Sequence, residues 1–368
     1  MKRILTPLIV LTSLAHTATA EPISPELVKQ TRAAIEKGVA FLKSQQKENG
    51  AWSEENMPAL TALPLWAVAA SGLPGTDDAQ TKAIRNLLGK QQPDGGVYVI
   101  QERQGGGLGN YNTSIALAAL HATGRKDLTP ALLKMRTYIA SSQYSGDDWH
   151  AGGFGYDKDA KRAYTDLNNT QFSMDAMRRS QNLEDLRPAG ERRADLNWDA
   201  ALKYVAQLQN KEGDTKGGFA YNTEDPKAGA ITNANSTVTL RAYGSMTYAG
   251  VLALLHAKID KRDPRVRAAF DYASRFWTVD EHPGQGQQGI FFYYNIMART
   301  LSAAGADTLP REKGGDIRWR EEMIKKVLSL QKPDGSWAND NNRWWENDPI
   351  LATSYALLAL EFASGITK

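Results

Sequence analysis

The chain has 368 residues, no cysteine, and 44 Lys and Arg against 41 Asp and Glu, which gives a formal net charge of +3. Without cysteine it has no disulfide, no thiolate nucleophile and no thiolate metal ligand. A charge so close to neutral does not indicate a nucleic acid or an anionic membrane surface as a partner, and we expect no nucleic-acid partner.

The first 20 residues, MKRILTPLIVLTSLAHTATA, have the pattern of a cleavable signal peptide. Lys2 and Arg3 precede an apolar stretch, and small residues at Ala18 and Ala20 precede Glu21. A membrane anchor is the alternative, but the apolar part is about a dozen residues and a span needs roughly 20. We therefore expect a periplasmic or secreted protein with no transmembrane segment in residues 21–368, which form one domain.

A single motif recurs along the chain: a Gln, followed four residues later by Gly and six residues later by an aromatic residue. Its Pro-Asp-Gly versions are typical of turns, because Gly adopts positive φ and Pro fixes its own φ. The Gln can tie the turn to the helix that precedes it, and the Trp can fill the gap between units. The repeat residues assigned in this register are Gln46, Gly50, Trp52, Gln91, Gly95, Trp149, Gln209, Gly213, Gln331, Gly335 and Trp337.

In chain order, six units follow, each with an amphipathic helix, a Gly-rich turn and a second, more apolar helix. A helix that is apolar nearly all round must be buried, so the second helices should form an inner ring and the first an outer ring. An open solenoid would need polar terminal repeats, and the last helix, ILATSYALLALEF, is too apolar for that role. The predicted first helices cover residues 34–44, 84–88, 132–139, 202–208, 266–277 and 323–330, and the second helices cover 58–70 and 243–256 or begin near 110, 166, 290 and 350.

The first unit resembles the Gln-Trp repeat of squalene and oxidosqualene cyclases and of protein prenyltransferase β subunits, at Lys37, Gly38, Phe41, Gln45 and its turn. The resemblance extends over essentially the whole mature chain. It implies an all-α (α/α)6 toroid with a central apolar cavity that holds isoprenoid chains. Small exported bacterial members of this repeat class are the most similar in length.

The catalytic motif of the cyclases is altered in this chain. Proton-initiated cyclases use Asp-x-Asp-Asp-Thr, and the matching segment here is DLNNT, in which Asp166 and Thr170 are kept and Asn168 and Asn169 replace the later carboxylates. An amide cannot protonate an alkene. The family's usual route is therefore not expected, and Asp166 is the candidate acid if it acts alone.

The zinc site of the prenyltransferases is also missing. Those enzymes bind zinc through Asp, Cys and His, whereas this chain has no Cys and has Ala352 at one ligand position. Tyr243 stands where their diphosphate-contacting His would be, and Thr247 is kept. We expect no metal and no cofactor.

Polar residues cluster at the starts of the predicted inner helices, where six N-termini would favour an anionic head group. Helix capping is the alternative role for them. Arg241 could supply countercharge, and the Trp pair at 344 and 345 could stack on a sugar or line the cavity. The candidate substrate-binding residues are Tyr111, Asn112, Asn168, Asn169, Thr170, Arg241, Tyr243, Thr247, Tyr294, Asn295, Trp344, Trp345, Asp348 and Thr353.

The sequence thus predicts an exported monomer that binds an isoprenoid-like or other extended apolar molecule in a central cavity. If it is an enzyme, it should be cyclase-like or transferase-like and independent of zinc. A polysaccharide lyase or hydrolase is one alternative, with Asp166 and Asp348 as the paired carboxylates. A non-catalytic interaction scaffold, whose cavity its own side chains fill, is the other.

Overall fold

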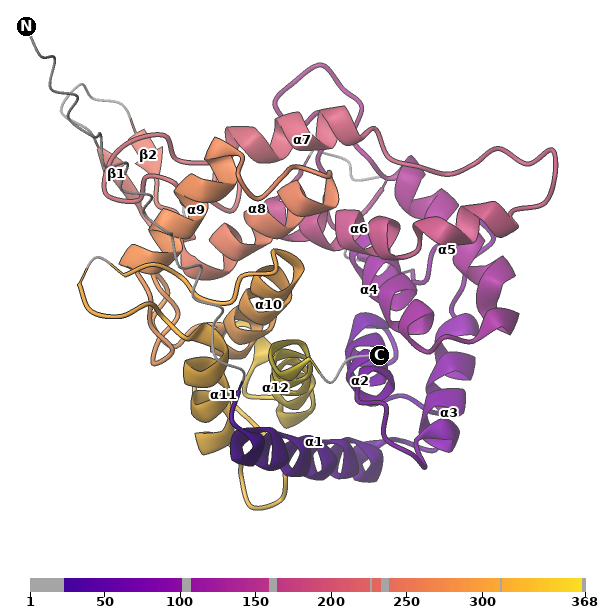
Figure 1. The fold of residues 1–368 in the computed structure, drawn as a ribbon. Helices are drawn as coiled ribbons and strands as arrows, with labels where there is room; N and C mark the ends of the chain where they lie inside the picture. Colours follow the sequence, from indigo (N-terminus) through magenta and orange to yellow (C-terminus); the bar gives the residue numbers. More distant parts are fainter. Residues whose placement is uncertain are drawn as a thin grey trace, which may run out of the picture.

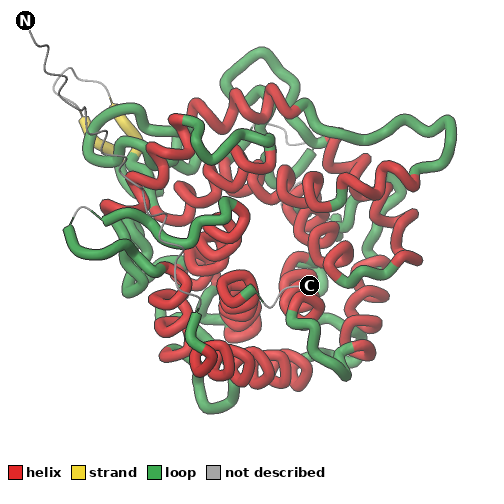
Figure 2. Tube along the Cα trace, in the orientation of Figure 1, coloured by secondary structure: helices red, strands yellow, loops and turns green. Residues whose placement is uncertain are grey.

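A computed structural model describes residues 23–100, 107–158, 164–225, 227–232, 238–311 and 313–365. In this part of the chain, twelve α-helices are arranged as two concentric rings (Figure 1). The predicted signal peptide lies outside the described residues and stays a prediction. Figure 2 shows that short loops join the helices, with longer loops in the units around α7 and α9.

The two rings alternate strictly along the chain. Each inner helix packs against the next one, α12 packs against α2, and α1 packs against both α11 and α12, so the ring is closed. The predicted all-α toroid is therefore correct, and an open solenoid is excluded. The outer helices are α1 (Pro25–Gln45), α3 (Asp77–Leu88), α5 (Thr129–Ser141), α7 (Trp198–Gln207), α9 (Pro264–Arg275) and α11 (Trp319–Ser329), and the inner helices are α2 (Ala59–Ala70), α4 (Gly109–Ala122), α6 (Leu167–Arg179), α8 (Gly244–His256), α10 (Ile290–Ala303) and α12 (Pro349–Ser364).

Burial follows the composition of the two helix types. Every residue of α2 is buried, whereas α3 buries only Ala79, Ala83, Ile84 and Leu87. An inner helix has neighbours on all sides, and only small and apolar side chains fill such a position without an unpaired polar group. The minor elements are three short 3-10 helices, η1 (Lys126–Leu128), η2 (Gln181–Leu186) and η3 (Arg343–Trp345), and an antiparallel pair that the sequence did not predict, β1 (Ala230–Thr232) with β2 (Val238–Leu240).

The repeated Gln residues join neighbouring units. Gln46 donates from Nε2 to the carbonyl of Gly50 at 3.1 Å and to that of Ala79 in α3 at 2.9 Å. The amide therefore ties the turn to the end of α1, as predicted, and it also binds the following outer helix. Four other glutamines bridge in the same way, namely Gln91, Gln143, Gln209 and Gln331.

The turn glycines lie against the same outer helices. A Cβ on Gly50, whose φ is +84°, would lie 2.2 Å from the carbonyl oxygen of Lys82, so no other residue fits there. In the fourth unit the equivalent residue is Gly217, whose Cβ would lie 2.1 Å from Ala268 O, while nothing lies within 4 Å of Gly213. The assignment of Gly213 to the repeat turn was therefore wrong.

The side chain two residues after each turn glycine is buried. At this position the third unit has Phe154, and the half-buried Trp149 lies elsewhere in the turn, so its assignment as the repeat Trp was wrong. A distance of six residues from Gln143 misled the prediction, because the third turn is longer than the first. The residues at this position are Trp52, Val97, Phe154, Phe219 and Trp337.

Candidate functional site

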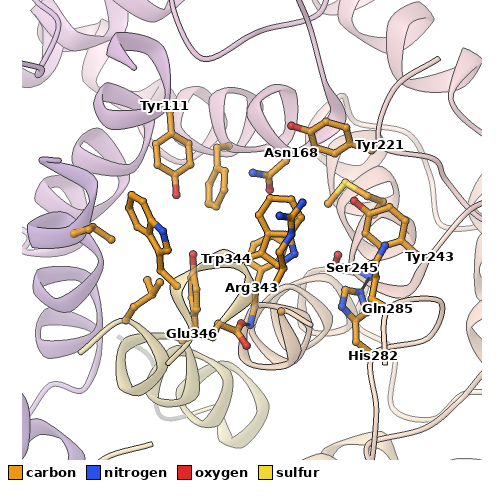
Figure 3. A pocket seen from close by; sticks show the side chains of 18 of the residues that line it. Tyr111, Asn168, Tyr221, Tyr243, Ser245, His282, Gln285, Arg343, Trp344 and Glu346 are labelled. Atoms are coloured by element: carbon orange, nitrogen blue, oxygen red, sulfur yellow. Dashed lines mark hydrogen bonds between the residues drawn. The ribbon is translucent and has the colours of Figure 1, made fainter. Parts of the chain in front are cut away.

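A cavity of about 430 Å³ lies at the N-terminal ends of the inner helices. This volume falls within the roughly 300–1,000 Å³ of small-molecule pockets. All six inner helices, or the loops that precede them, contribute to its wall, and the lining residues lie at or near the starts of these helices. Figure 3 shows most of the side chains that line the cavity. The predicted polar residues that line it are Tyr111, Asn168, Tyr243, Trp344 and Trp345.

Several polar side chains gather on one side of the cavity, and the other side combines aliphatic side chains with Tyr111 and Glu346 (Figure 3). Asn168, Tyr221, Tyr243, Ser245 and Gln285 lie together on one side, from α6, α8 and the loops before α8 and α10 (Figure 3). The starts of α2, α4 and α12 contribute aliphatic side chains and a methionine to the wall, namely Met57, Leu60, Leu108 and Leu351.

Aromatic side chains make up much of the wall: nine of the 21 lining residues are Tyr, Phe or Trp. Burial raises the pKa of Tyr111 and of Tyr156 well above the ordinary value of a phenol. The hydroxyl groups of these residues therefore remain protonated at neutral pH and act as hydrogen-bond donors. The result is an aromatic chamber edged with hydroxyl groups.

The N-terminal N–H groups of the inner helices are occupied, mostly by groups from the following unit. Ala59 N in α2 donates to Asn112 Oδ1 at 2.9 Å, and Gly109 N in α4 donates to Asp157 Oδ1 at 2.7 Å. Leu167 N in α6 donates to the carbonyl of Tyr221 at 2.8 Å. These donors face protein acceptors, so the predicted capture of an anionic head group by helix N-termini does not fit the structure.

His282 is one residue that the sequence analysis missed as a site residue. Its Nε2 accepts from Ser245 N in α8 at 2.9 Å, and its Nδ1 lies 2.8 Å from the carbonyl of Gln288, which assigns the ring proton to Nδ1. Burial lowers the pKa of His282 to about 4, so the ring is neutral at pH 7. Its ring stacks on Tyr293 with the centroids 5.0 Å apart.

Glu346 is the second missed residue. Its carboxylate accepts from Phe292 N at 2.7 Å, from Phe291 N at 3.2 Å and from Asn339 Nδ2 at 3.0 Å, and it therefore caps α10 from the loop of the next unit. The side chain is fully buried, and burial raises its pKa. The only signal in the sequence is its place directly after Trp344 and Trp345, which does not distinguish a cap from a surface residue.

Asp166, the candidate acid, caps α6 and lies behind the cavity wall. Its Oδ1 accepts from Asn169 N at 2.8 Å and its Oδ2 from Asn169 Nδ2 at 2.7 Å. Burial raises the pKa of Asp166 to about 6, against the lowering effect of hydrogen bonds from Asn169 and Tyr221. Tyr221 and Tyr156 line the cavity, and Tyr164 donates to the hydroxyl of Tyr221 at 3.1 Å. The acid role of Asp166 stays a prediction, and it would act through these hydroxyls.

Three predicted threonines serve the repeat instead of the cavity. The hydroxyls of these threonines accept a hydrogen bond from the backbone N–H of the buried residue two positions after the turn glycine. The pairs are Phe154 N with Thr170 at 3.0 Å, Phe219 N with Thr247 at 3.2 Å and Trp337 N with Thr353 at 2.9 Å. Each one therefore ties an inner helix to its own turn. These threonines do not line the cavity, so their assignment as substrate ligands was wrong.

The remaining predicted residues also lie outside the cavity wall. Asp348 caps α12 through Ile350 N at 2.8 Å, and the hydroxyl of Tyr294 donates to Val279 O at 2.6 Å. Arg241 is exposed, and Asn295 is buried in α10 with no hydrogen-bond partner for its amide. Because Asp348 does not reach the cavity, it cannot pair with Asp166 across it.

The two tryptophans at the mouth have an unusual backbone. Trp344 and Trp345 both have φ of +61°, which is a strained conformation for side chains of this size. They are 44% and 56% exposed, and the guanidinium of Arg343 lies 4.3 Å from the centroid of the Trp344 ring. Strain of this kind persists where the surrounding structure imposes it, and it is concentrated at ligand sites.

Farther along the inner helices, a charged cluster replaces the cavity. Asp175 follows the cavity-lining Phe172 by three residues in α6, and its carboxylate binds Arg299 Nη2 at 2.6 Å and Arg179 Nε at 2.8 Å. These cations hold the pKa of Asp175 well below its usual range despite its burial. Arg299 also lies over the ring of Trp66, 4.8 Å from its centroid. The centre of the toroid is thus open at one end and packed at the other.

Comparison with known proteins gives structural likeness and no likeness of sequence. No family model and no curated protein matches the chain. A variant of the type II terpene cyclase MstE from Scytonema, solved with geranylgeranyl dihydroxybenzoate, has a TM-score of 0.56 at 14% identity, over 94% of this chain and 100% of that one. The chain therefore has a terpenoid-cyclase-like fold.

Enzymes that act on sugars match at similar levels. A GH76 α-mannanase from Bacteroides thetaiotaomicron has a TM-score of 0.52 at 11% identity, over 91% of this chain and 96% of that one. A glycosidase solved with glucose has a TM-score of 0.52 at 10% identity, over 94% of this chain and 100% of that one. At such identities the likeness establishes the fold alone.

The described residues hold no candidate metal site and no candidate membrane span. No group of three or more His, Asp or Glu side chains there is placed to hold a metal ion. No helix in the same part of the chain has both the length and the apolar character of a membrane span.

Proposed function

We propose that this protein binds an isoprenoid-like or other extended apolar molecule in the cavity at the starts of its inner helices. The cavity itself is the observation that carries the proposal: about 430 Å³, built largely from aromatic and aliphatic side chains inside a closed toroid. The MstE structure with geranylgeranyl dihydroxybenzoate is a protein of the same fold with such a molecule bound.

The test is to purify the mature protein from its native host, extract it with organic solvent and identify the extract by mass spectrometry. A polyprenyl or terpenoid species in stoichiometric amount supports the proposal. An extract with no apolar molecule, from protein that also fails to bind geranylgeraniol in solution, contradicts it. A variant with Phe172 and Phe292 changed to Asp is the control, since both rings line the cavity.

Action on a polysaccharide is the second candidate, and two observations favour it. Exposed Trp344 and Trp345 at the mouth are suited to stacking on sugar rings, and an α-mannanase and a glycosidase share the fold. Against it, a hydrolase needs two carboxyl groups that face each other across the substrate, and Glu346 is the only carboxylate among the described lining residues. Thermal stabilisation by mannose or glucose oligomers, without any by a polyprenyl alcohol, would favour this candidate.

A scaffold role requires a filled centre, and the structure fills only the end that holds Asp175 and Arg299. We further propose export to the periplasm or the medium and a monomeric state. N-terminal sequencing of the protein from the periplasmic fraction tests the first, since cleavage after Ala20 leaves Glu21 at the N-terminus. Light scattering coupled to gel filtration tests the second.

A further inference from the structure

We infer that the ligand carries an uncharged hydroxyl group at its polar end, held on the Asn168 side of the cavity, and that it is not a diphosphate. This inference rests on the proposed function and narrows its ligand class. Three independent features of the cavity support it: its charges, its occupied helix ends and one unpaired amide.

The charges of the wall do not suit an anion with several negative charges. Among the described lining residues Arg343 is the only Lys or Arg, and the buried carboxyl of Glu346 shares the same wall. Lys227 lies over the rim ring of Trp344, at 5.5 Å, but it is paired with Asp225 at 2.7 Å. A diphosphate brought into this partly enclosed space would lose its hydration without gaining the countercharge that offsets the loss.

The helix ends add nothing for a phosphate group. A phosphate at a helix N-terminus depends on free backbone N–H groups. In α10 those of Phe291 and Phe292 are bound by Glu346, and in α8 that of Ser245 is bound by His282. The site that would receive a phosphate in other folds is thus filled by side chains of this chain, and two of those side chains themselves form the cavity wall.

The unpaired amide indicates what the ligand supplies. Asn168 lines the cavity (Figure 3), and its side-chain amide makes no hydrogen bond within the described part of the chain. An amide without a partner in a partly enclosed space costs free energy, and a ligand that forms a hydrogen bond with it recovers that cost. A hydroxyl group both donates and accepts, so it satisfies the amide in either orientation.

The neighbouring groups complete a site for an alcohol. Burial raises the pKa of Tyr243 well above the ordinary value of a phenol, so its hydroxyl stays protonated and can donate to the ligand's oxygen. Tyr243 and Asn168 lie on the same side of the cavity (Figure 3). The apolar body of the ligand then extends toward the aliphatic side chains of Leu60 and Leu351.

The experiment compares three probes by isothermal titration: geranylgeraniol, geranylgeranyl diphosphate and squalene, each with the wild type, Asn168→Ala and Asn182→Ala. Asn182 is an exposed Asn on η2 and lies outside the cavity wall. We expect the wild type to bind the alcohol at least about tenfold more tightly than the diphosphate. Loss of one neutral hydrogen bond in Asn168→Ala should weaken alcohol binding about three- to tenfold. Squalene binding should not change, and Asn182→Ala should change nothing.

Each other outcome overturns a definite part of the inference. Diphosphate binding as tight as that of the alcohol refutes the hydroxyl preference and leaves the proposed function intact. Equal affinity for squalene and the alcohol does the same. A preference for the alcohol that survives Asn168→Ala refutes the assignment to Asn168. Failure of all three probes to bind removes the proposed function itself.

Discussion

Gln331 donates a hydrogen bond of 2.9 Å from Nε2 to the carbonyl of Ala34, which lies 297 residues earlier in the chain. The same amide binds Gly335 O at 3.0 Å. These two hydrogen bonds attach the last repeat turn of the chain to its first helix. The other bridged pairs of neighbouring units are joined by the same kind of contact, so the contact that closes the ring is the one that the repeat uses throughout. The repeat motif therefore both joins neighbouring units and closes the ring.

The closing glutamine should contribute measurably to stability. Gln331→Ala removes both hydrogen bonds and leaves two carbonyl groups to be satisfied by water, so we expect a loss of about 1–3 kcal/mol in the free energy of unfolding. Urea denaturation followed by circular dichroism measures it. Gln45→Ala is the matched control, because Gln45 is exposed and bonds only to the neighbouring Ser44. Equal effects of the two substitutions would show that the bridge is not stabilising.

Two glycines in one loop allow the cost of a positive φ to be distinguished from the cost of a close backbone contact. Gly213 and Gly217 both have positive φ, +75° and +89°, but only Gly217 lies against a backbone carbonyl. We expect Gly213→Ala to cost about 1–2 kcal/mol through the left-handed backbone. Gly217→Ala should cost more, about 3–5 kcal/mol, because the methyl group displaces α9. Thermal unfolding of both variants tests the reassignment of the repeat turn, and similar losses would reject it.

The carboxyl group of Asp166 should make stability depend on pH. Its folded-state pKa, about 6, is above the unfolded value of about 3.9, so the ionised form is disfavoured by folding. The penalty is fully present above pH 6 and disappears as the pH falls toward 4, which gives a gain of up to about 3 kcal/mol from this group.

Asp166→Asn should flatten that profile between pH 4 and 7 while the helix cap is kept, because Asn also caps helices well. Denaturation midpoints across this range give the comparison with wild type, and Asp348→Asn, which alters the cap of α12, is the control. A wild-type profile unchanged in the variant would contradict the assignment. If the protein has a turnover, the same substitution should abolish it.

We expect the tryptophan pair to strengthen ligand binding at a cost to the stability of the fold. Trp345→Gly relieves a left-handed backbone that costs about 1–2 kcal/mol for a side chain with Cβ. Because Trp345 is more than half exposed, little packing is lost with it. We expect the variant to be as stable as wild type or more stable, and to bind geranylgeraniol more weakly. A fall in stability with unchanged affinity would mean that Trp345 supports the fold and not the ligand.

The fold could be predicted from the sequence because the patterns that specify it lie within short segments of the chain. The spacing of Gln331 and Gly335 recurs since each turn meets the same neighbour, and the Ala- and Leu-rich composition of α2 or α12 follows from burial on every side. Where the turn length varies, the repeat positions assigned from sequence spacing were wrong, as at Gly213 and Trp149. A turn glycine is identified by the backbone that it touches, and sequence spacing does not report that contact.

The residues of the cavity could be predicted from the sequence only in part. Of the predicted polar residues, Tyr111, Asn168 and Tyr243 line the cavity, whereas Thr170 and Thr247 hold the repeat turns. The same residue types occur at the same helix ends, and rotation about the helix axis by a single residue decides between the two roles. Glu346 and His282 were missed because each caps a helix of another unit, a relation with no periodic trace in the sequence.

The sequence by itself determined the number of units, the alternation of outer and inner helices and the absence of thiolate chemistry, since each depends on composition and on contacts between adjacent segments. Only the tertiary structure decided that the helix ends are already occupied, that one end of the centre is packed with charge, and which side chains face the remaining space. Those features depend on the orientation of side chains from distant units, which closure of the ring brings together.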